Sequence, residues 1–95
     1  MTRILVSIAL LAFGASAAQA ACYADYKAKQ DNPLRLHYGV IEIDASPCEP
    51  SPAVENTITR RLAAGGWTLL QVESVFDESA LDAKRSDAGE YFLRF

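Results

Sequence analysis

Three kinds of side chain in this sequence could do chemistry: two cysteines, a single histidine, and scattered serines and carboxylates. Cys22 and Cys48 lie far apart in the chain, so they lack the Cys-x-x-Cys spacing typical of a redox-active pair. A metal site needs more ligands than these cysteines and His37, which the sequence leaves scattered. In an exported domain an even pair of cysteines is typical of a disulfide. We therefore predict a Cys22–Cys48 disulfide.

The first twenty residues have the pattern of a secretory signal peptide. Arg3 supplies the positive start, residues 4–13 form an apolar core, and Ala18-Gln19-Ala20 ends the segment with small residues around a cleavage site. The apolar core is shorter than the roughly 20 residues that span a bilayer. We expect residues 1–20 to be removed, which leaves residues 21–95 as a periplasmic or secreted chain.

A lipoprotein anchored at Cys22 is the alternative, because lipoprotein signals also place a cysteine after such a segment. Their processing site usually carries leucine three residues before the cysteine, and here that residue is Gln19. Lipidation of Cys22 would also leave Cys48 as a lone thiol in an oxidising compartment. The disulfide is therefore favoured over the lipid anchor.

The charge of the mature chain argues against several classes of partner. Without Arg3, eight basic and twelve acidic residues remain, a net charge of −4. The only adjacent basic pairs are Arg60-Arg61 and Lys84-Arg85. Nucleic acid and anionic membranes both attract a concentrated basic face, so neither is expected to bind after signal cleavage. The length allows one small domain.

No catalytic, cofactor or metal site is predicted. His37 alternates with Leu36 and Tyr38 along a predicted strand, so it is expected to face outward as a partly exposed structural residue. The serines lack a G-x-S-x-G context, and the carboxylates form no calcium-loop motif. The glycines in "AGGW" follow a helix, whereas a phosphate-binding loop precedes one.

The patterning predicts a strand over residues 34–44 and a helix after it. The apolar positions of the strand change side near Gly39, which favours a β-bulge; the alternative is a strand buried on both faces at its far end. Ser51 and Pro52 are typical of a helix start, and Gly65 of a left-handed end. Val54, Ile58 and Leu62 form the buried stripe of the helix.

Two further strands complete the predicted sheet. Residues 67–76 form the second, residues 77–85 a short helix or ordered loop, and "EYFLRF", residues 90–95, the third. This order predicts an α+β fold, a two-layer β-α-β-β sandwich whose three-stranded mixed sheet packs on one main helix. The position of the third strand, central or at an edge, stays open.

The glycine-tryptophan segment carries a resemblance. Gly66-Trp67, followed by Leu69 and Val72 after a helix, resembles a group of small domains of unknown function with a helix–Gly-Trp-x-Leu–strand core. The mature chain, with "CYADYKAKQDNPLRLHYGVIEI", is similar to uncharacterised exported proteins of alphaproteobacteria. The resemblance implies a small exported fold and no particular activity.

The sheet face away from the helix is the candidate interaction surface. By alternation it carries Trp67, Leu69 and Phe92, and the disulfide requires residues 22–33 to run back along the first strand. Tyr23 and Tyr26, three apart, would share a helical face over this surface. The predicted interaction residues are Tyr23, Tyr26, Trp67, Leu69 and Phe92.

These features indicate an exported, disulfide-stapled interaction or accessory domain without a catalytic site. Its expected partner is another periplasmic protein or a second copy of the chain. The alternative is a small-molecule or peptide binder that uses a cleft under the aromatic residues. An enzyme centred on His37 is a third and weaker hypothesis.

Overall fold

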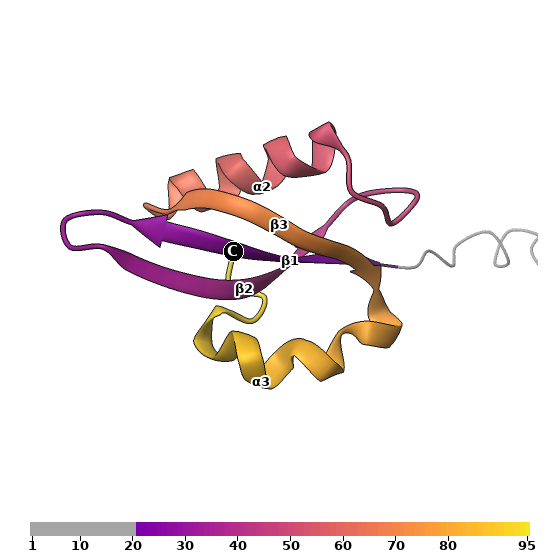
Figure 1. Cartoon of the computed structure of the whole chain (residues 1–95). Helices are drawn as coiled ribbons and strands as arrows, with labels where there is room; N and C mark the ends of the chain where they lie inside the picture. The colour runs from indigo at the N-terminus through magenta and orange to yellow at the C-terminus, as the bar shows by residue number, and fades with distance from the viewer. Residues whose placement is uncertain (1–20) are drawn as a thin grey trace, which may run out of the picture.

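The computed structural model describes residues 21–95, and the expected signal peptide lies outside the described residues. A three-stranded antiparallel sheet has helix α2 on one face and a chain of short helical turns on the other (Figure 1). The predicted α+β class is confirmed. In chain order the elements are β1 (Cys22–Gln30), β2 (Arg35–Ile43), α2 (Pro52–Ala64), β3 (Thr68–Asp77), η1 (Glu78–Ala80), η2 (Asp82–Lys84), α3 (Arg85–Ala88) and η3 (Gly89–Tyr91).

Strand β1 lies at the centre of the sheet, where no strand was predicted. The strand order is β2-β1-β3, and both pairings are antiparallel, so the sheet is not mixed. The return run of residues 22–33 along the next strand is confirmed, but as a paired strand and not as a helix. A tight turn at Asp31–Leu34, with Asn32 at φ 62°, joins β1 to β2.

Strand β2 contains no bulge at Gly39. Its register with β1 is continuous from Cys22↔Ile43 to Gln30↔Arg35. Val40 and Ile41 are both buried, so the alternative of a strand buried on both faces is confirmed. The structure gives a different explanation for a glycine at position 39. Gly39 lies opposite Tyr26, and a Cβ at this position would overlap the Tyr26 ring. Glycine lets the aromatic ring lie against the backbone of the neighbouring strand.

Helix α2 begins and ends close to the predicted residues. The Ser51 hydroxyl accepts a hydrogen bond from the Val54 N–H, and Pro52 occupies the first turn. At the other end Gly66, not Gly65, is left-handed, with φ 87°. The Trp67 N–H donates to the Leu62 carbonyl, which is the pattern of a Schellman cap and brings Trp67 against the helix.

Strand β3 contains two irregularities in its pairing with β1, one between Asp25 and Tyr26 and one between Lys27 and Ala28. Each skips one residue of β3, Glu73 in the first case and Leu70 in the second. The extra residues change the side-chain alternation. The residues of β3 that pack on the α2 side are consequently three apart: Leu69, Val72 and Val75.

The C-terminal residues form helical turns and an extended tail instead of the predicted final strand. Residues 78–91 cover the sheet face opposite α2 (Figure 1). The tail then passes the outer edge of β2, where Phe92 makes an isolated parallel bridge with Val40. The Leu93 N–H donates to the Val40 carbonyl at 2.8 Å. The sheet is therefore covered on both faces, and the two-layer prediction was wrong on this point.

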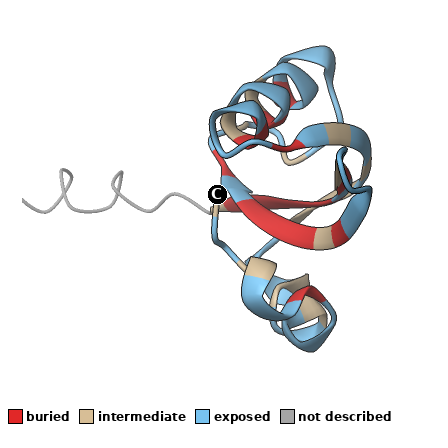
Figure 2. Ribbon diagram, turned by 90° about the vertical axis from the view of Figure 1, so that its left-hand side faces the viewer, coloured by how far each residue is buried: buried red, intermediate tan, exposed pale blue. Residues whose placement is uncertain are grey.

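Buried residues form one cluster on each side of the sheet (Figure 2). The helix-side core joins Ala24, Tyr26 and Ala28 of β1 to the buried stripe of α2, Val54, Ile58 and Leu62. The tail-side core is smaller and centres on Tyr23, Val40 and Ala88. None of the helices within residues 21–95 is long and apolar enough to cross a membrane.

The predicted disulfide joins Cys22 to Cys48 with a Cα–Cα distance of 5.6 Å. Cys22 pairs with Ile43 at the end of β2, and the following loop brings Cys48 back to the start of β1. The bond therefore ties the first strand to the loop that leads into α2. Within residues 21–95 both cysteines are used in this bond.

Removing the disulfide should lower the stability of the domain without changing its fold. Closing a loop with a sequence separation of 26 contributes about 3.5 kcal/mol in the chain-entropy model. For a domain of this size that corresponds to a fall in Tm of roughly 15–25 °C. Calorimetry of Cys48→Ser should give this shift, and reductant should give the same shift in the unmodified protein. Equal melting curves for the oxidised protein and the variant would exclude a stabilising bond.

Candidate functional site

The structure does not bring the five predicted interaction residues together. Tyr23 and Tyr26 are three apart on a strand, so they face opposite sides of the sheet. Tyr26 and Trp67 are buried in the helix-side core, with Leu69 half-buried against it. Tyr23 is buried on the tail side, where Phe92 packs against the same cluster. The expected aromatic cleft therefore has no counterpart among residues 21–95.

His37 is buried in a cluster of aromatic rings, contrary to the outward orientation predicted for it. It is 8% exposed and lies on the outer strand β2. Its ring stacks on Tyr91 with centroids 3.7 Å apart and forms a T-shaped pair with Trp67, with centroids 4.2 Å apart. Its Nε2 lies 2.8 Å from the Tyr26 hydroxyl. The tail and the central strand therefore meet at this one imidazole.

The surroundings of His37 favour its neutral form. Burial lowers the pKa of His37 below its usual value; Glu90 acts against this shift and Arg94 adds to it. Nδ1 is buried and has no hydrogen-bond partner among the described residues. Burial likewise raises the pKa of Tyr26, with Tyr91 nearby as a smaller cause. The pair is a neutral phenol and a neutral imidazole at pH 7.

Asp25 is the second buried polar group and lies on the tail side of the sheet. It is 4% exposed and accepts hydrogen bonds from three elements. Tyr38 of β2 donates at 2.7 Å, Ser74 of β3 at 2.5 Å, and the Lys84 ammonium of η2 at 3.0 Å. One carboxylate on the central strand therefore holds both neighbouring strands and the C-terminal turns.

These donors keep Asp25 ionised. Burial alone would raise the pKa of Asp25, but the hydrogen bonds from Ser74, Tyr38 and Lys84 and the Lys84 charge outweigh it, so the pKa lies below its usual value. Burial raises the pKa of Tyr38, and its bond to the Asp25 carboxylate raises it further. The composition of this cluster is similar to that of an acid–base site. Each donor in it, however, is hydrogen-bonded to Asp25 and joins one element of the fold to β1.

Three exposed leucines gather at the end of the sheet that the C-terminal turns leave uncovered. Leu34 and Leu36 are 64% and 65% exposed, and Leu70 is 50% exposed. Leu36 and Leu70 line a shallow groove of about 320 Å³, together with Lys27, Ala28, His37 and Tyr38. We call Leu34, Leu36 and Leu70 the leucine patch.

The charges around the leucine patch are balanced. Lys27 forms an ion pair with Glu73 at 3.7 Å, and Lys29 forms one with Asp31 at 3.4 Å. Lys29 pairs with Leu36 across the two strands, so cations and leucines share one face of the sheet. The patch is therefore apolar at its centre, with both signs of charge at its rim.

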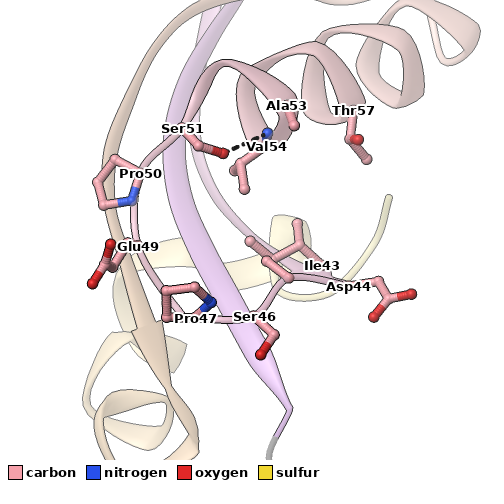
Figure 3. A pocket seen from close by; sticks show the side chains of 11 residues that line it. Ile43, Asp44, Ser46, Pro47, Glu49, Pro50, Ser51, Ala53, Val54 and Thr57 are labelled. Atoms are coloured by element: carbon pink, nitrogen blue, oxygen red, sulfur yellow. Dashed lines mark hydrogen bonds between the residues drawn. The ribbon is translucent and has the colours of Figure 1, made fainter.

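A second hollow, of about 350 Å³, lies between the disulfide loop and the start of α2 (Figure 3). The Ser51 hydroxyl is already used as the helix cap, 3.2 Å from the Val54 nitrogen. Asp44 and Glu49 lie on opposite sides of the hollow and point away from each other (Figure 3). The two carboxylates of this hollow are therefore not paired, and the Ser51 hydroxyl is engaged by the helix.

Residues 21–95 contain no group of three His, Cys, Asp or Glu side chains placed to hold a metal ion. Comparisons with protein-family models, with curated proteins and with solved structures gave no match to this chain.

Sequence reasoning missed the leucine patch and the Asp25 cluster for the same reason. Both lie on β1 or opposite it, and β1 was not recognised as a strand. The signal was present: Tyr23, Asp25 and Lys27 alternate with Cys22, Ala24, Tyr26 and Ala28. A period of two with the turn sequence Asp31-Asn32-Pro33 predicts a hairpin.

Replacing Asp25 should remove a pH-dependent part of the stability. Because the folded-state pKa is depressed, ionised Asp25 stabilises the fold above its unfolded value of 3.8, and this stability is lost as the pH falls below it. Asp25→Ala should lower the free energy of unfolding by about 3 kcal/mol at pH 7, since it leaves Lys84 without its buried partner.

Urea unfolding of Asp25→Asn at pH 7 and pH 3 provides the measurement. The unmodified protein should lose more stability between these two values than the variant does. Glu73→Gln is the matched control, because its carboxylate is on the same sheet face but exposed, and its effect should stay within about 0.5 kcal/mol. An equal pH response of Asp25→Asn and the unmodified protein would contradict the role of Asp25.

Proposed function

We propose that the mature chain is an exported, non-catalytic interaction domain that binds an extended segment of a protein partner through the leucine patch. The disulfide supports export, because such bonds persist mainly in oxidising compartments. A lipid thioether on Cys22 would need the sulfur that is bonded to Cys48, which favours the processed form over the lipoprotein.

The exposure of the leucine patch is the observation that carries this proposal. Large apolar side chains that are half or more exposed and adjacent to a groove are unusual in a small domain with two covered cores. Leu36 lies on the paired strand β2, Leu70 at an irregularity of β3 and Leu34 in the turn between β1 and β2. An apolar surface with a polar rim is typical of a recognition site.

The charge balance selects the kind of partner. The two lysines at the rim are paired with Glu73 and Asp31, so the patch offers little net attraction to a phosphate backbone or an anionic lipid surface. The groove is at the lower limit of the roughly 300–1,000 Å³ typical of small-molecule pockets. A peptide segment with one or two apolar side chains fits both properties.

Leu36→Asp should abolish binding and leave the fold intact. Leu36 is largely exposed, so the change in stability should be within about 0.5 kcal/mol, whereas a carboxylate placed in an apolar contact should weaken binding at least tenfold. Leu93→Asp is the matched control, because Leu93 is 42% exposed and lies outside the patch.

A random twelve-residue peptide library, selected against the unmodified protein, supplies the probe. Selected peptides should carry apolar residues, bind Leu93→Asp, and fail to bind Leu36→Asp. Peptides that bind both variants equally would reject the patch as the site. A doubled mass in sedimentation equilibrium that Leu36→Asp reduces to the monomer would assign the patch to a second copy of the chain instead.

The N-terminal residue and the intact mass of the protein test the proposed export. The protein isolated from the envelope of cells that express the full sequence should begin at Ala21, and its intact mass should be lower by about two hydrogens than that of the reduced form. An N-terminal residue other than Ala21, or an added acyl mass on Cys22, would contradict the proposed processing.

A further inference from the structure

We propose that His37 is a pH-sensitive latch, and that protonation of its ring releases the C-terminal tail, Tyr91–Phe95, from the outer edge of β2. This inference is independent of the partner that the leucine patch binds.

The tail closes an edge that would otherwise be available for pairing. Leu93 donates to the Val40 carbonyl, and Phe92 forms the bridge beside it. The Phe95 carbonyl accepts a hydrogen bond of 2.6 Å from Arg61 of α2, which fixes the end of the tail. An unpaired strand edge is a template for another strand, so the tail protects the sheet on this side.

His37 lies beneath the tail and contacts it through aromatic rings. Tyr91 stacks on the imidazole at 3.7 Å, and Phe95 lies nearly parallel to it at 6.0 Å. Trp67 closes the cluster from the end of α2. The tail therefore stays in place through contacts with a ring that can change its charge in the mildly acidic range.

The neutral and the charged ring both leave Nδ1 without a partner among the described residues, but the charged ring also brings a charge into the aromatic cluster. When the Tyr26 hydroxyl donates to Nε2, the imidazole proton is on Nδ1. A second proton makes both nitrogens donors: Nε2 can donate to the Tyr26 oxygen, while Nδ1 remains unpartnered. The charge would be enclosed by rings, and cation–π attraction of about 0.5–2 kcal/mol is smaller than the penalty for burying an unpaired ion.

The two charged groups that act on His37 work in opposite directions. Glu90 of η3 favours the charged ring, Arg94 of the tail disfavours it, and the two side chains pair with each other at 3.6 Å. From β1 and the tail, Tyr26 and Tyr91 present phenols, and Arg61 of α2, which bonds the end of the tail, is engaged by backbone carbonyls. Trp67, in the connection between α2 and β3, also packs against His37 and carries no charge.

The direction of the pH effect follows from burial. Because burial depresses the pKa of His37 in the closed state, the released state takes up the proton more readily. The closed tail is fully stabilised above the ordinary value of 6.5 and is progressively lost as the pH falls below it. One proton linked in this way increases tail opening by up to about 30-fold between pH 7.5 and pH 5.0.

The test follows the tail and the imidazole in the oxidised mature protein. Hydrogen exchange of the Leu93 amide, corrected for the intrinsic effect of pH, should accelerate by the stated factor at pH 5.0, while amides of β1 stay protected. The single Trp67, 4.2 Å from His37, should report the same transition by fluorescence. Asp25→Asn should keep the transition, which separates it from the acid unfolding linked to Asp25.

His37→Phe should remove the pH response of the tail because it keeps a ring and loses the titration. A transition of the same size in a folded His37→Phe would overturn the proposal. If this variant does not fold, NMR titration of the His37 Cε1 proton in the unmodified protein decides the question. The latch requires tail opening to follow that titration, and protonation of His37 with unchanged protection of Leu93 would reject it.

Discussion

The burial of strand β1 on both faces is the constraint on which the rest of the structure depends. Its small side chains, Ala24 and Ala28, allow α2 to approach the sheet on either side of Tyr26. Its other face places Asp25 where both neighbouring strands and Lys84 can reach it. Cys22, at its first residue, anchors the loop that leads into α2. The same nine residues therefore determine helix packing, closure of the opposite face and the covalent tie.

The sequence allowed the disulfide and helix α2 to be predicted because both depend on local or purely chemical signals. Two cysteines in a chain expected to be exported have few alternatives, and Ser51 and Pro52 provide capping chemistry that tertiary contacts do not override. The left-handed residue at the helix end is Gly66 and not the predicted Gly65. Strand β1 was missed because alanine, lysine and aspartate are poor strand formers. Its two-residue period, not its composition, indicates the strand.

The candidate surface was harder to predict, because assigning a side chain to a face requires the register of its strand. The two extra residues in β3 bring Leu69, Val72 and Val75 to one face, and no pattern within residues 68–77 locates those extra residues before the pairing with β1 is known. The sequence of the aromatic tail alternates like that of a strand. In the structure, contacts with Arg61 and His37 keep the tail across the outer edge of β2 instead. Such contacts connect distant parts of the chain and leave no local signal.

The leucine patch and the tail give the domain two distinct surfaces, one exposed and one closed, on a common sheet. Both surfaces require β1 to be the central strand of the sheet. Residue-resolved hydrogen exchange of the oxidised mature protein at neutral pH tests this position most directly. The amides of Ala24–Ala28 should exchange only through global unfolding and should be the slowest in the molecule, slower than those of residues 90–95. Exchange of Ala24–Ala28 at the rate of an unpaired loop, with the strongest protection instead in residues 90–95, would contradict this structure.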